Sequence, residues 1–186
     1  MRSIQTLKGK LGTMSHAASQ PRSKSLRCLV FVLCLAMSSL VASSTLAEEV
    51  PSLAFSLGAF NFNKSPTVLE GGVEYRHPID VWKLAIAGGL YANVDGAVWI
   101  FGGLRRDFHL GGAWLITPAF GLTLYEEGDS KDLGGVFEFR SALEVGYQWS
   151  NLHRVALGIS HLSNAGIYDL NPGSNSLIVT YSLPLK

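Results

Sequence analysis

Cysteine is nearly absent from this chain of 186 residues. There are two, Cys28 and Cys34, and both lie in one apolar run near the N-terminus. If that run is removed on export, the mature chain has no thiol, no disulfide and no cysteine metal site. An excess of one charge sign is also lacking, since the formal net charge is +1. This balance gives no indication of a nucleic-acid partner.

The apolar run from Cys28 to Ala42 follows several Lys and Arg residues and precedes a stretch of small residues that ends at Ala47. This pattern predicts a secretory signal peptide over residues 1–47, cleaved after Ala47, with Met14 as an alternative start. An uncleaved anchor is the competing interpretation, but the run is shorter than the roughly 20 residues that span a bilayer as a helix. We therefore expect one mature domain, residues 48–186.

Helical periodicity is missing from the mature chain, where hydrophobic residues alternate with polar or small ones instead. In the segment 136–149 the apolar and aromatic residues share one parity, and Glu138, Arg140 and Glu144 share the other. With Gly, Pro, Asn and Asp clusters as breakers, the pattern predicts an all-β fold of eight strands. The predicted strands are 51–62, 68–77, 84–93, 98–107, 114–126, 136–149, 154–163 and 174–185.

Two all-β architectures fit this alternation: a soluble barrel or sandwich with the apolar face inside, and a transmembrane barrel with that face outside. Eight is an even number, and strands of about ten residues match tilted membrane crossings. The opposite face of the strands, which has the charged residues, combines acids and arginines with small residues. This combination suits the narrow interior of an eight-stranded barrel. Aromatic residues near the predicted strand ends resemble interfacial girdles. We therefore predict an antiparallel transmembrane β-barrel in a bacterial outer membrane. The aromatics are Tyr75, Trp82, Trp99, Trp114, Tyr147, Trp149 and Tyr181.

The seventh predicted strand ends in the sequence HLSNAG, residues 161–166, and NPG follows at residues 171–173. This pair of motifs resembles the signature of the lipid A 3-O-deacylase (PagL-like) family. The resemblance implies an eight-stranded outer-membrane barrel that hydrolyses the ester-linked acyl chain at position 3 of lipid A. It implies no cofactor, and the sequence shows no metal-ligand spacing.

By this resemblance His161 is the general base and Ser163 the nucleophile, while Asn164, with Ala165 and Gly166, supports the oxyanion. Residues two apart in a strand point the same way, so an imidazole and a hydroxyl at these positions stand side by side. Such a pair can attack an ester carbonyl. Both share the parity of the apolar residues of their strand, so we expect them to face lipid at the outer-leaflet end.

The chain departs from the family at Asn175, where the resemblance implies a glutamate as the triad acid. A carboxamide can fix a histidine tautomer but cannot stabilise imidazolium by charge, and Asp169 in the adjoining loop is a possible substitute acid. Two functions therefore stay open: an acyl-ester hydrolase acting on lipid A of lipopolysaccharide, and a structural or lipid-binding barrel with weakened or lost catalysis. The sequence also leaves open a homodimer and the identity of the acyl chain.

Overall fold

The computed structural model describes residues 50–185, so the predicted signal peptide lies outside the described residues. Among these residues, strands account for nearly all regular structure, and a single turn of 3₁₀ helix, η1 (Val81–Lys83), joins the second strand to the third. No helix within residues 50–185 is long and apolar enough to cross a membrane. The strands are β1 (Ser52–Phe60), β2 (Val68–Ile79), β3 (Leu84–Asn93), β4 (Val98–Arg106), β5 (Phe108–Gly111), β6 (Trp114–Glu126), β7 (Phe137–Gln148), β8 (Arg154–Ser163) and β9 (Ser174–Pro184).

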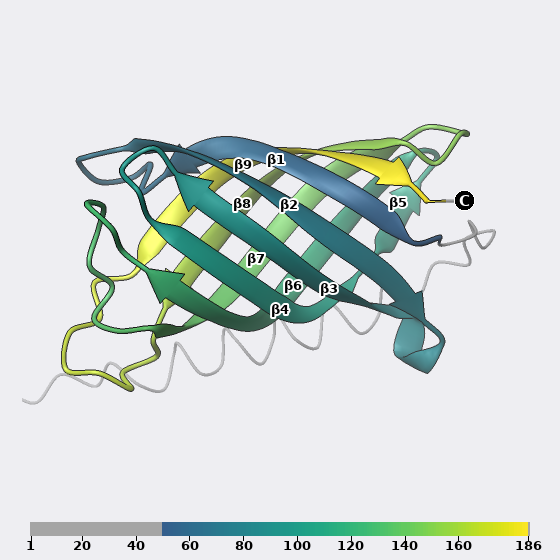
Figure 1. Ribbon diagram of the computed structural model, residues 1–186. Coiled ribbons are helices and arrows are strands. Elements are labelled where there is room, and N and C mark those ends of the chain that lie inside the picture. The colour runs from purple at the N-terminus through teal and green to yellow at the C-terminus, as the bar shows by residue number, and fades with distance from the viewer. Residues whose placement is uncertain (1–49, 186) are drawn as a thin grey trace, which may run out of the picture. The chain divides into compact units, whose positions relative to one another are not determined.

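Neighbouring strands pair antiparallel, β1 pairs with the last strand β9, and β4 pairs with β6, which closes the sheet. Figure 1 shows the tilted strands winding around this barrel, with β9 (yellow) beside β1 (blue). The short β5 pairs with β6 just beyond β4, so β4 and β5 act as one interrupted strand of eight. The predicted eight-stranded antiparallel barrel is confirmed.

The interruption between β4 and β5 has a local cause in the partner strand. Arg105 pairs with Ala119 and Phe108 with Ile116, so the register places Pro118 opposite Arg106. Proline has no backbone N–H to donate to the ladder, and the pairing breaks there. The Thr117 hydroxyl instead donates to the Asp107 carboxylate at 2.5 Å.

Side chains alternate strictly between the two faces of the wall, and the apolar parity points outward. Leu57, Phe120 and Leu122 are each about 60% exposed, and similar residues surround the whole barrel. A soluble protein does not expose a continuous apolar surface of this size, whereas a membrane barrel needs one. The structure therefore favours the membrane architecture over the soluble barrel.

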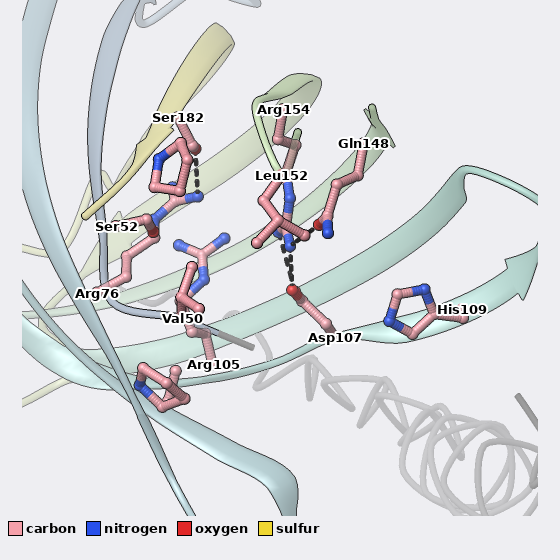
Figure 2. A pocket seen from close by; sticks show the side chains of 13 residues that line it. Val50, Ser52, Arg76, Arg105, Asp107, His109, Gln148, Leu152, Arg154 and Ser182 are labelled. Carbon is pink, nitrogen blue, oxygen red and sulfur yellow. Dashed lines mark hydrogen bonds and ion pairs between the residues drawn. The ribbon is translucent and has the colours of Figure 1, made fainter. Parts of the chain in front are cut away.

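The charged parity points into the barrel, as predicted, and its members form a buried ionic network. Glu74 accepts from Arg105 at 2.6 Å and from Arg76 at 2.7 Å, and Glu144 bonds both arginines from the opposite wall. Asp107 pairs with Arg154 at the same end of the interior (Figure 2). Each charged member of this network thus has an opposite partner, which buried ions require. Glu70 and Glu138 are also buried but form no ion pair within residues 50–185, and Glu70 accepts a hydrogen bond from the Ser176 hydroxyl instead. The sequence analysis assigns Glu144 to the charged parity but does not identify Arg105, Asp107 or Arg154.

An aromatic layer fills the interior toward the other end, and it corrects one expectation. Trp99 is 3% exposed and stacks on Tyr91 with ring centroids 5.7 Å apart, so it belongs to the interior and not to a girdle. Its alternation with Val98 and Ile100, which point outward, dictates this placement. Gly72 makes room for the layer, because a Cβ there would lie 2.1 Å from the Tyr91 ring. The other girdle aromatics keep outward positions near the η1 end, including Trp114 and Tyr147 in edge contact at 5.3 Å.

Candidate active site

His161 and Ser163 lie at the end of β8 and project from the outer wall, as predicted. His161 is exposed and follows Leu157 and Ile159 on the same parity, both more than half exposed. Ser163 is half-buried on that parity, while the residue between them, Leu162, is buried inside the barrel. The strand geometry therefore places imidazole and hydroxyl on the face that meets lipid.

Asn175 faces His161 directly across the β8–β9 pair. The ring Nδ1 lies 2.8 Å from the Asn175 Oδ1, so Nδ1–H donates to the carboxamide oxygen. This contact fixes the tautomer in which Nε2 carries no proton and can act as a base. Position 175 thus has the geometry of a triad acid with an uncharged group in its place.

The NPG turn that precedes β9 packs against the same imidazole. Gly173 has a positive φ of 56°, which only glycine adopts readily, and a Cβ there would lie 3.0 Å from His161 Cε1. Glycine is therefore required twice, for the backbone conformation and for the close approach of the ring. In the sequence NPG stands only as part of the motif that resembles the family signature, and the contact with His161 is not indicated there because it depends on the β8–β9 register.

Ser163 and His161 form no hydrogen bond in this conformation, as far as the described residues show. Their Cα atoms are about 6.6 Å apart along an extended strand, so contact depends on the two side-chain rotamers. Ser163 pairs across the other side of β8 with Phe139. Catalytic hydrogen bonds are commonly long or absent before substrate binds, and rotation of the serine hydroxyl toward Nε2 would complete the pair.

The side chain of Asn164 is fully buried and serves as a bridge between two outer loops. Its Nδ2 donates to Leu133 O at 2.9 Å and to Leu170 O at 2.8 Å, and its Oδ1 accepts from Gly166 N at 2.9 Å. Both amide hydrogens are thus engaged and unable to reach an oxyanion outside the wall. Asn164 supports the site by fixing the loop that follows Ser163.

Ala165 and Gly166 adopt positive φ angles of 55° and 82°, so the chain turns sharply just after the serine. The N–H of Gly166 is occupied by Asn164, whereas the N–H of Ala165 has no acceptor among residues 50–185. A non-glycine residue in this conformation is uncommon and is found at functional sites more than elsewhere. Of the predicted support residues, Ala165 supplies an available backbone donor close to Ser163.

Asp169 is exposed in the loop between β8 and β9. Within the described chain it makes neither an ion pair nor a hydrogen bond with His161, whose Nδ1 is already bonded to Asn175. The structure therefore brings together His161, Asn175 and, two residues away, Ser163, but it does not bring Asp169 to them.

A groove of about 260 Å³ opens on the outer wall beside the imidazole. Ser141 and Ala142 on β7 line it together with Leu143, Ile159 and Phe62. Its lining is mainly apolar, and it faces the lipid side of the barrel. Phe62 reaches it from the loop after β1, and no pattern in the sequence indicates that contact. A hydrocarbon chain fits such a surface better than water does.

Known proteins share the fold of this chain and part of its sequence. A solved structure of the outer-membrane enzyme PagL shares the fold, with a TM-score of 0.62 and 18% identity over 72% of this chain and 99% of that one. Neisserial surface protein A gives 0.52 and 13% identity over 73% and 96% of the two chains. The lipid A deacylase PagL of Bordetella bronchiseptica is 31% identical over 74 residues, which are 39% of this chain and 42% of that protein.

The family model for lipid A 3-O-deacylase (PagL) matches residues 59–184, which include the barrel from the end of β1 onward and the whole candidate site. This match agrees with the resemblance seen in the HLSNAG and NPG motifs and with the predicted location in the bacterial outer membrane. The chain belongs to the lipid A 3-O-deacylase (PagL) family.

Proposed function

We propose that this protein is an outer-membrane acyl-ester hydrolase that removes an ester-linked 3-hydroxyacyl chain from lipid A. The observation that carries the proposal is the contact between His161 and Asn175 on the outer wall, with Ser163 two residues along the same face. The site lies where the ester linkages of an outer-leaflet glycolipid would be found. The substrate would reach it without leaving the membrane.

In the proposed reaction the Ser163 hydroxyl attacks the ester carbonyl while His161 Nε2 accepts its proton. The Ala165 N–H donates to the developing oxyanion, the role for which preorganised backbone donors are suited. The imidazolium then returns the proton to the departing sugar oxygen, which leaves an acyl-serine. Water, deprotonated by the same imidazole, attacks this ester. The acyl–Oγ bond then breaks, the imidazolium returns the proton to Ser163 Oγ, and the fatty acid is released.

The groove beside His161 supports an acyl substrate. Its apolar lining descends from the imidazole along β7 and β8 toward the middle of the membrane. A chain lying in it would have its ester carbonyl at the level of the catalytic pair and its tail among lipid. This arrangement suits a substrate with a polar sugar at one end and hydrocarbon at the other.

Asn175 supports a second candidate, a lipid-binding barrel whose catalysis has been lost. A carboxamide orients the imidazole but leaves the positive charge of the imidazolium without a counter-ion. The fold and the groove would then retain affinity for lipid A without turnover. This alternative predicts binding to lipid A by the native protein and no release of fatty acid.

One measurement distinguishes the hydrolase from the lipid-binding barrel. Purified barrel in detergent is incubated with lipopolysaccharide, and the lipid A and free fatty acids are analysed by mass spectrometry. Hydrolysis releases a 3-hydroxy fatty acid from the native protein and none from Ser163→Ala. Equal release from both proteins would remove Ser163 as the nucleophile, and no release from the native protein would favour the binding barrel.

A further inference from the structure

Two lysines from different outer loops converge on the NPG turn beside the candidate site. Lys64 Nζ, in the loop after β1, donates to Pro172 O at 3.3 Å. Lys131 Nζ, in the loop after β6, donates to Gly173 O at 2.5 Å and to Asn61 Oδ1 at 2.9 Å. Gly173 is the residue that packs on the His161 ring, so Lys131 is bonded to the residue next to the imidazole and Lys64 to the residue before it.

Neither lysine has an acidic partner among residues 50–185, where the ion pairs all lie inside the barrel. An ammonium group has three hydrogens, so Lys64 keeps two donors for another ligand and Lys131 keeps one. Burial lowers the pKa of Lys131, and the neighbouring charge of Lys64 lowers it further. Two neighbouring cations without a counter-ion repel each other, and a bound anion would reduce that repulsion.

The lysines also line a cavity of about 190 Å³ at the outer mouth of the barrel, together with Ser65, Ser130 and Asn61. Asp95 and Asp129 lie on the same cavity, and neither is within ion-pair distance of a lysine. The charged lining of the cavity thus consists of two carboxylates and two ammonium groups, and both ammonium groups are bonded to the NPG turn. Its size accommodates a group such as phosphate.

We propose that Lys64 and Lys131 form an anion subsite that binds a phosphate group of the glycolipid substrate and so positions its ester over Ser163. This inference rests on the proposed function, and it adds a recognition element outside the catalytic residues. Lipid A is a phosphorylated and acylated sugar, so one molecule can occupy the cationic turn and the apolar groove together. A charge-assisted bond from lysine is the ordinary way to hold such a phosphate.

Binding is measured first on the Ser163→Ala barrel in nonionic detergent, so that turnover plays no part. The probes are phosphorylated lipid A and the same lipid A after chemical removal of its phosphates. We expect each of Lys64→Gln and Lys131→Gln to weaken binding of the phosphorylated lipid about fivefold, as for a lysine near an anionic lipid. Binding of the dephosphorylated lipid should stay unchanged in both variants.

Matched variants separate charge from packing. Lys64→Arg and Lys131→Arg keep the charge and should keep most of the affinity. Lys83→Gln removes one lysine from η1 at the opposite end of the barrel and should have no effect. Asp129→Asn removes a repelling carboxylate from the cavity and should tighten binding of the phosphorylated lipid. Inorganic phosphate is added as a competitor, and lysine-dependent displacement at micromolar phosphate would indicate a free-anion site instead of a lipid subsite.

Equal affinity of the parent barrel for the two lipids would overturn the proposal, as would lysine variants that weaken both lipids alike. The second result would mean that the lysines only hold the NPG turn in place. Hydrolysis gives an independent readout: Lys64→Gln should raise KM for phosphorylated lipid A by a larger factor than it raises KM for dephosphorylated lipid A. If the native protein cleaves neither substrate, the proposed hydrolase fails, while the binding comparison still decides the anion subsite.

Discussion

His161 and Asn175 are direct cross-strand neighbours on the outer wall, and a hydrogen bond of 2.8 Å joins the ring Nδ1 to the carboxamide oxygen. The contact reproduces the orienting half of a catalytic triad, because it fixes which nitrogen can accept a proton. It lacks the electrostatic half, because a carboxamide is neutral. The activity of this chain therefore depends on how much of the rate the missing charge would supply.

Replacing Asn175 with aspartate tests this directly, since the two side chains have the same shape. Asn175→Asp keeps an oxygen facing Nδ1 and adds the charge, so kcat for ester cleavage should rise, by about 10⁴-fold at most if the full triad effect is recovered. Asn175→Glu restores the residue that the family resemblance implies and should also gain activity. The measurement is the initial rate of fatty-acid release.

Asn175→Leu is the control, because it keeps the number and branching of the side-chain heavy atoms and removes the acceptor. It should lose activity relative to the native chain while its barrel unfolds at the same urea concentration. An aspartate variant no faster than the native protein would show that this position does not act on the imidazole during catalysis.

Gly173→Ala should displace the imidazole, because the new methyl group would lie 3.0 Å from Cε1 and the φ of 56° disfavours any side chain. We expect at least about a tenfold loss of kcat, the effect of about 1.4 kcal/mol on the barrier. Gly112→Ala is a matched control with a φ of 59° and open space around its Cβ, at the other end of the barrel. Comparable loss in both variants would attribute the effect to backbone strain alone.

Glu74→Gln should destabilise the barrel, because Glu74 is 2% exposed and bonds Arg76, Arg105 and the Tyr91 hydroxyl. Removing one partner of a buried ionic network costs about 3–5 kcal/mol. The free energy of unfolding in lipid vesicles, followed by tryptophan fluorescence during urea titration, provides the measurement. Glu126→Gln, at an exposed strand end, should change that energy by less than about 0.5 kcal/mol. A similar small change in Glu74→Gln would show that the network is dispensable.

Gly72→Ala should also destabilise the barrel, since the added methyl would overlap the Tyr91 ring. Overpacking of this kind costs about 1–3 kcal/mol. In a Tyr91→Ala background the same substitution should cost less, and this difference measures the contact between the two positions. Gly102→Ala, which meets nothing within 4 Å, serves as the control in the same urea titration. Additive effects of Gly72→Ala and Tyr91→Ala would contradict a steric origin.

Most of the barrel was predictable because its two faces differ so strongly in polarity. The alternation around Glu138, Arg140 and Glu144 has a period of two, which assigns each residue to the interior or the exterior. Trp99 was misplaced because its position near a strand end suggested a girdle, although its parity with Phe101 pointed inward. The break at Asp107 depends on Pro118 in the partner strand, and a prediction from single segments does not include such pairing.

The candidate site was predictable only where sequence neighbours are also spatial neighbours. His161 and Ser163 belong to one strand, and the β8–β9 hairpin brings Asn175 to them at short range. The contacts of Asn164 with Leu133, and of Lys131 with Gly173, join loops more than thirty residues apart. Such contacts follow from barrel closure, so no local pattern indicates them.

The exterior position of His161, Ser163 and Asn175 separates the residues that build the barrel from those that give it chemistry. Assembly depends on the interior ions and rings, none of which touches the imidazole. An exchange at position 175 therefore leaves the interior packing unchanged. Over evolutionary time, such a scaffold can lose or regain a reaction through single exterior replacements while selection for membrane insertion continues unaltered.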